Sequence, residues 1–103
     1  MGRYLLRITA QESETSLELT VEGRLAGPWV AELSRAWTEL EPRLGQRKLS
    51  LDLRSVMYAD AEGTAVLRAI VAERNAEVVA SSPWTQYLAE EIKRNVSSET
   101  GGV

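Results

Sequence analysis

The chain has 103 residues and a formal net charge of −3 at pH 7, and it contains no cysteine and no histidine. A chain of this length folds as one domain around one modest core, without disulfides or thiolate chemistry. The missing histidine removes the commonest metal ligand and general base, and the negative charge argues against nucleic acid as a partner.

The N-terminal quarter predicts two consecutive strands. Residues 3–12 and residues 17–22 each alternate between apolar and polar side chains, which is the period of a half-buried strand. The polar segment between them predicts a turn, so we expect an antiparallel pair. Gly23 and Gly27 are expected to punctuate the exit of the second strand.

The first strand is also a candidate sheet edge. Arg3 and Arg7 would protect such an edge against unwanted pairing, because charged side chains there disfavour aggregation. If the edge instead pairs with a second copy, a two-fold homodimer follows. The sequence leaves both outcomes open.

The next segment predicts an amphipathic helix from Pro28 to Glu41, with proline at the first helical position. Pro42 and Gly45 are expected to end this helix. Its apolar residues recur at helical spacing. They are Trp29, Leu33, Ala36, Trp37 and Leu40.

The central segment predicts a third strand over residues 48–53, an apolar loop to residue 59, and a second helix from Ala61 to Arg74. Asp60 suits the N-cap of that helix, and Asn75 suits its stop. A short strand over residues 77–80 should follow. A third helix then starts at Ser82-Pro83, with Trp84, Leu88 and Ile92 as its buried stripe.

The predicted order is therefore β-β-α-β-α-β-α. Strands that alternate with helices form parallel crossovers, so we expect an α/β fold with a mixed four-stranded sheet and helices mainly on one face. Residues 1–96 are predicted to form the single domain. Residues 97–103 are small and polar, and we expect them to form a flexible C-terminal tail.

The two sides of the second helix differ in character. Its buried stripe is predicted to consist of Gly63, Leu67, Ile70 and Val71. The opposite side carries Ala61, Glu62, Ala65, Ala69 and Ala72. Such a smooth face would let a partner approach closely, but alanine is also the best helix former at solvent positions. Both interpretations stay open on the residue pattern alone.

Four further side chains have mainly structural interpretations. Trp29, Trp37 and Trp84 lie on apolar stripes and are expected in the core, although Trp29 and Trp84 occupy first turns where a ring can also join an interface. Asp52 lies on the polar face of the third strand. It is expected to bond to neighbouring backbone or to an arginine.

The segment from Leu51-Asp52-Leu53 to Asp60-Ala61-Glu62-Gly63 resembles the signature of the STAS domain, the fold of bacterial anti-sigma factor antagonists. In that family a Leu-Asp-Leu strand leads to Asp-Ser-Ser-Gly or Asp-Ser-Thr-Gly and then a helix, and a serine of the tetrapeptide is phosphorylated. The resemblance extends along nearly the whole chain. Here Ala61 and Glu62 replace the hydroxyl residues, so the phosphorylation site is degenerate.

The resemblance implies a non-enzymatic, cytoplasmic domain that binds a kinase-type anti-sigma factor through this corner and the helix after it. The implied partner-binding residues are Asp60, Ala61, Glu62, Gly63, Thr64, Ala65, Arg68, Ala69 and Ala72. Without an acceptor, the domain is either permanently able to bind or permanently blocked by Glu62, whose single fixed charge is a crude substitute for phosphate. Thr64 is out of register as a substitute acceptor.

Two other functions remain as alternatives. Some STAS domains are subunits of ABC transporters, including lipid transporters, where they bind beside the ATPase subunit without a phosphorylation cycle. A small enzyme or ligand-binding domain is the weakest interpretation, because no metal spacing, phosphate loop or nucleophile elbow is present. We therefore expect no cofactor, no metal and no membrane insertion.

Overall fold

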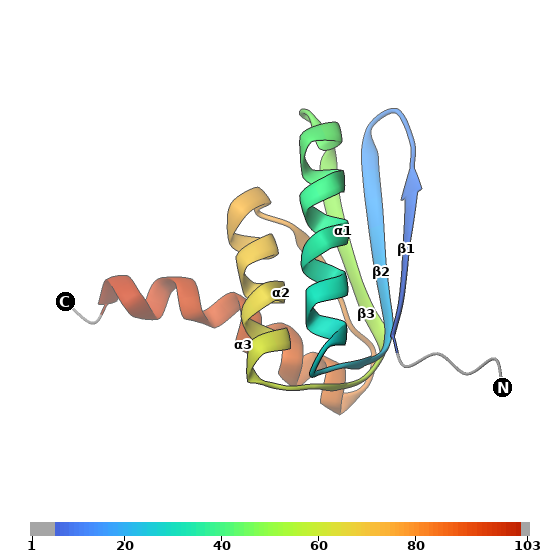
Figure 1. The fold of residues 1–103 in the computed structure, drawn as a ribbon. Helices are drawn as coiled ribbons and strands as arrows, with labels where there is room; N and C mark the ends of the chain where they lie inside the picture. The colour runs from blue at the N-terminus through green and yellow to red at the C-terminus, as the bar shows by residue number, and fades with distance from the viewer. Residues whose placement is uncertain (1–5, 102–103) are drawn as a thin grey trace, which may run out of the picture.

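The computed structural model describes the backbone of residues 6–101 and the side chains of residues 6–93. Four strands form one sheet in the order β1-β2-β3-β4, with β1 antiparallel to β2 and the other neighbours parallel (Figure 1). The strands are β1 (Leu6–Glu12), β2 (Ser16–Leu25), β3 (Lys48–Ala59) and β4 (Glu77–Val79). The helices are α1 (Trp29–Leu44), α2 (Ala61–Arg74) and α3 (Pro83–Gly101). This architecture confirms the predicted α/β class and element order.

The core lies between the sheet and the helices. Helices α1 and α2 lie side by side against the sheet, and α3 packs against α2 and β3 (Figure 1). Alternate residues of β2 and β3 point into this core and meet the apolar stripes of the helices. The fully buried side chains include Leu17, Leu19, Leu33, Leu51, Leu67, Ile70 and Ile92. The predicted buried stripe and exposed side of α2 are both confirmed.

All three tryptophans pack against the core, as predicted. Trp37 is buried, and its indole Nε1 donates to a carboxylate oxygen of Glu73 at 2.8 Å, which joins α1 to α2. Trp29 and Trp84 are half-buried against the same cluster. The indole Nε1 of Trp84 donates to the carbonyl oxygen of Val56 at 2.9 Å, so the start of α3 is anchored to β3.

The predicted end of the first helix at Glu41 is wrong, because α1 continues through Pro42 to Leu44, whereas Gly45 ends the helix as its C-cap, as predicted. Proline removes one backbone N–H from the last turn. However, the guanidinium groups of Arg47 and Arg74 donate to main-chain carbonyl oxygens that the helix end leaves without partners. Arg74 bonds the carbonyls of Glu41 and Gly45, and Arg47 bonds those of Arg43 and Leu44. This tertiary capping stabilises the additional turn.

The loop predicted after Leu53 and the strand end predicted near Gly23 are also wrong. The strands β2 and β3 pair in parallel up to Leu25 and Ala59, with register shifts after Thr20 and after Gly23. These irregularities break the two-residue alternation of the sequence, so the pattern stops before the strands do. Gly23 has φ of 98°, a conformation that favours glycine.

The ends of α2 and β4 follow the predictions closely, whereas α3 extends further than predicted. Helix α2 starts and stops where predicted, with Asn75 in the left-handed conformation at φ 52°. The last strand ends at Val79, one residue before the predicted end. Helix α3 continues to Gly101, so backbone expected as a tail is helical up to that residue, and residues 102–103 lie outside the described residues. Arg3 also lies outside them.

Candidate protein-binding site at the start of α2

Asp60 holds the corner where β3 turns into α2. One carboxylate oxygen accepts from the backbone N–H of Gly63 at 2.7 Å, which caps the helix. The other accepts from the N–H of Gly27 at 3.1 Å, in the loop between β2 and α1. The hydrogen bond from Gly63, followed by that from Gly27, lowers the pKa of Asp60. One side chain therefore caps α2 and ties two connections together.

Replacing Asp60 with asparagine is expected to remove one component of the acid sensitivity of the fold. The pKa of Asp60 is lower in the folded chain than its ordinary value of 3.8. Its charged form therefore stabilises the fold above that value, and this contribution is lost as the pH falls through the folded pKa. In urea unfolding at several pH values, the stability of wild type should exceed that of D60N at neutral pH and converge with it in acid.

Asp52 also contributes to the acid sensitivity of the fold, because its pKa is lowered as well. The cause is the hydrogen bond from the Arg54 side chain, which outweighs the opposing effect of burial. D60N keeps Asp52, so the difference between wild type and D60N isolates the contribution of Asp60. A difference between wild type and D60N that stays constant with pH would contradict the assignment to Asp60.

Asp52 is buried and accepts from both the guanidinium and the backbone N–H of Arg54, which confirms its predicted structural bonds.

Gly63 lies at the closest approach between α2 and β2. A Cβ atom at this position would lie 2.5 Å from the carbonyl oxygen of Leu25 and 2.8 Å from its Cγ. No side chain fits there without movement of the backbone. Gly63 is buried, so its role at the predicted partner-binding surface is to set the position of the helix rather than to contact a partner.

The outer face of α2 is exposed along its whole length. Its exposed residues are Ala61, Glu62, Ala65, Ala69, Ala72 and Glu73. Glu62 lies in the first turn, where the helix dipole favours a negative charge, and Glu73 accepts from Trp37 in the last turn, so the middle of the face presents single methyl groups. The backbone of α2 is therefore accessible to a close partner over about three turns.

A pocket of about 340 Å³ adjoins this face, between α2 and α3. Thr64 and Arg68 line it from α2, and Trp84, Tyr87 and Glu91 line it from α3. The Thr64 hydroxyl donates to the carbonyl oxygen of Asp60 at 2.9 Å, so it is already engaged. Arg68 reaches the carbonyl oxygen of Glu91 through Nη2 at 3.5 Å. Its Nε is buried and has no hydrogen-bond partner among the described residues.

Sequence reasoning missed three exposed apolar side chains near this corner. Tyr87 is 58% exposed at the pocket mouth, where its ring centroid lies 6.2 Å from that of Trp84. Met57 and Tyr58, at the end of β3, are 74% and 42% exposed, and the Arg24 guanidinium lies 4.8 Å from the Tyr58 ring centroid. The sequence signal for Met57 and Tyr58 is a pair of large apolar residues that only Ala59 separates from the N-cap residue Asp60, in a segment predicted to be a loop.

The structure thus places the sequence-predicted site residues at the Asp60 corner and along α2, with Gly63 below the surface. Ala61, Thr64 and Arg68 line the pocket, and Ala65, Ala69 and Ala72 lie outside it. No helix in the described part of the chain is long and apolar enough to cross a membrane. In comparisons with known proteins, no family model matches the chain, and no curated protein matches its sequence.

Proposed function

We propose that the chain is a non-enzymatic, cytoplasmic regulatory domain of the STAS type, which binds a kinase-type anti-sigma factor through the Asp60 corner and the outer face of α2. The observation that carries this proposal is the exposed face of α2, where three alanines lie between Glu62 and Glu73 beside the pocket lined by Thr64 and Arg68. A partner helix can approach the methyl groups of this face closely.

The missing phosphate acceptor favours a partner contact without an on–off switch. Neither Ala61 nor Glu62 offers a hydroxyl, and the hydroxyl of Thr64 is half-buried and bonded to Asp60. Phosphorylation of Thr64 would therefore remove its side-chain bond to the Asp60 carbonyl at the first turn of α2. Glu62 places one permanent negative charge on the surface, where a phosphate would carry about −1.5 to −2.

A second candidate is an ABC transporter subunit of the lipid type that binds its ATPase subunit. The observation that favours it is the same fixed corner, since a permanent assembly needs no acceptor residue. The two candidates use the same surface of this chain. They differ only in the class of protein that occupies it, so one experiment separates them.

Replacing Ala65 with arginine is expected to weaken partner binding by about 30-fold or more, because a long charged side chain in the centre of a close contact costs at least about 2 kcal/mol. Tagged wild type, A65R and A31R should each be used to capture proteins from the native host. The captured partner is then purified and titrated against all three. A31R is the matched control, since Ala31 is also an exposed alanine, on α1.

Capture of a kinase-type anti-sigma factor by wild type and A31R, but not by A65R, would support the first candidate. Capture of an ABC ATPase with the same discrimination would support the second. Equal binding of A65R and wild type to either partner would place the contact elsewhere on the molecule and would refute the proposed surface.

A further inference from the structure

The outer edge of β1 is open. β1 pairs only with β2, and within the described residues no strand lies along its other side. Its seven residues pair with β2 in continuous register, without a bulge and without proline. A long, regular edge of this kind offers unpaired N–H and C=O groups to another strand.

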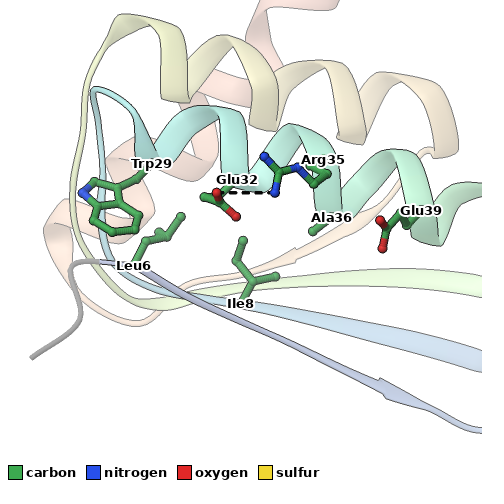
Figure 2. A pocket seen from close by; sticks show the side chains of 7 residues that line it. All are labelled: Leu6, Ile8, Trp29, Glu32, Arg35, Ala36 and Glu39. Carbon is green, nitrogen blue, oxygen red and sulfur yellow. Dashed lines mark ion pairs between the residues drawn. The ribbon is translucent and has the colours of Figure 1, made fainter. Parts of the chain in front are cut away.

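A groove of about 370 Å³ follows this edge on the side of α1 (Figure 2). Leu6 and Ile8 point from β1 toward the helix, and Trp29 closes one end. Glu32 and Arg35 form its rim on α1, at an N–O separation of 3.6 Å with both side chains largely exposed. The open edge and the groove are continuous, which is the arrangement that β-strand addition uses.

The alignment of α1 with β1 can be deduced from two contacts. Leu6 and Trp29 lie together at one end of the groove, and Arg43 bonds Glu12 at 2.6 Å toward the other. Six strand steps and fourteen helix steps both span about 20 Å, so the two elements run level with one another. Their midpoints are Thr9 on β1 and Ala36 on α1.

We propose that two copies of the chain join through antiparallel pairing of their β1 strands, about a two-fold axis that passes at Thr9 perpendicular to the sheet. This axis keeps both grooves on the same face and makes one continuous sheet. Ile8 then lies opposite Ala10 of the second copy, and Arg7 lies opposite its Gln11. No like charges face each other across the new junction.

The charges on α1 favour a second copy as the occupant. Because the axis reverses the direction of α1, Glu39 comes within two residues, about 3 Å along the helix axis, of the level of Arg35 of the second copy, and Arg35 comes equally close to the level of its Glu39. The charges along the rim of the groove are thus complementary between the two copies, with two carboxylate–guanidinium pairings across the junction. The present Glu32–Arg35 pair is exposed and weak, so Arg35 can exchange partners at little cost.

A cysteine at Thr9 tests this pairing directly, because the chain has no cysteine of its own. Residues opposite one another in an antiparallel pair have Cβ atoms at about 4.5–5.5 Å, within reach of a disulfide after a small adjustment. Under mild oxidation, T9C should form a covalent dimer at least about tenfold faster than A72C, since only the former cysteine meets its copy at the axis. Ala72 is an exposed position on α2.

Sedimentation equilibrium of the unmodified chain should show a concentration-dependent dimer. A mixture of T9D and T9K should dimerise several-fold more tightly than either variant alone, because opposite charges then meet where like charges repel. A wild-type chain that stays monomeric, or a dimer in which T9C crosslinks no faster than A72C, would overturn the proposal. The second result would mean an interface on another face.

Discussion

Replacing Gly63 with alanine is expected to destabilise the fold by about 2–3 kcal/mol, although alanine is intrinsically the better helix former. The reason is the position of the added methyl group, 2.5 Å from the carbonyl oxygen of Leu25. That atom belongs to the backbone at the end of β2, so it cannot turn aside as a flexible side chain would. Either α2 or the end of β2 must move, and the core between them loses its packing.

The free energy of unfolding in urea, measured for wild type and G63A, checks this prediction. A69G is the matched control, because Ala69 is exposed on the same helix and its replacement measures helix propensity alone, at up to about 1 kcal/mol. A G63A protein at least as stable as wild type would show that α2 does not approach β2 as closely as described. Loss of partner binding in G63A would also be expected, since the glycine positions the outer face of α2.

Replacing Leu51 with alanine is expected to cost about 3–5 kcal/mol, the largest effect of any single truncation proposed for this chain. Leu51 is fully buried in the first half of β3, where it is in register with Leu19 of β2 and Val78 of β4. Neighbouring strands on both sides restrict how far the site can collapse, so a cavity remains. A domain of this size is stable by only about 5–15 kcal/mol, so L51A removes a large share of the total.

The neighbouring residue Ser50 supplies the control for Leu51. Its side chain lies on the other face of β3 and is partly exposed, so S50A should change the free energy of unfolding by no more than about 0.5 kcal/mol. Thermal or urea unfolding of both variants gives the comparison. If S50A were as damaging as L51A, the assignment of the two faces of β3 would be wrong. L51V, expected to lose only about 1 kcal/mol, keeps the test usable if L51A does not fold.

The sequence by itself determined the order of the elements, the limits of α2 and the side of that helix which is buried. Each of these depends on local chemistry. Alternation with period two marks a strand, recurrence near 3.6 residues marks a helix face, and Asp60 and Asn75 cap and stop α2 through bonds to backbone only a few residues away. Gly63 also indicated that another part of the backbone lies close to α2, but the sequence did not identify which residue that is.

Only the tertiary structure decided how far β3 and α1 extend, because both ends depend on residues distant in sequence. The second half of β3 is a strand because β2 pairs with it through two register shifts, and no local pattern encodes a partner strand. The helix α1 passes Pro42 because Arg74, 33 residues from Glu41, donates to the Glu41 carbonyl oxygen, and Arg47, just beyond the helix end, donates to that of Arg43.

The candidate site shows the same division. The exposed alanines of α2 follow from helical spacing, but the pocket at Arg68 exists only because α3 packs beside α2 and brings Trp84 and Tyr87 to the corner. The groove along β1 likewise requires α1 to return over the sheet edge. Periodicity specifies which face of an element is apolar. Packing among segments that are far apart in the sequence decides which element covers that face and where a pocket or groove remains.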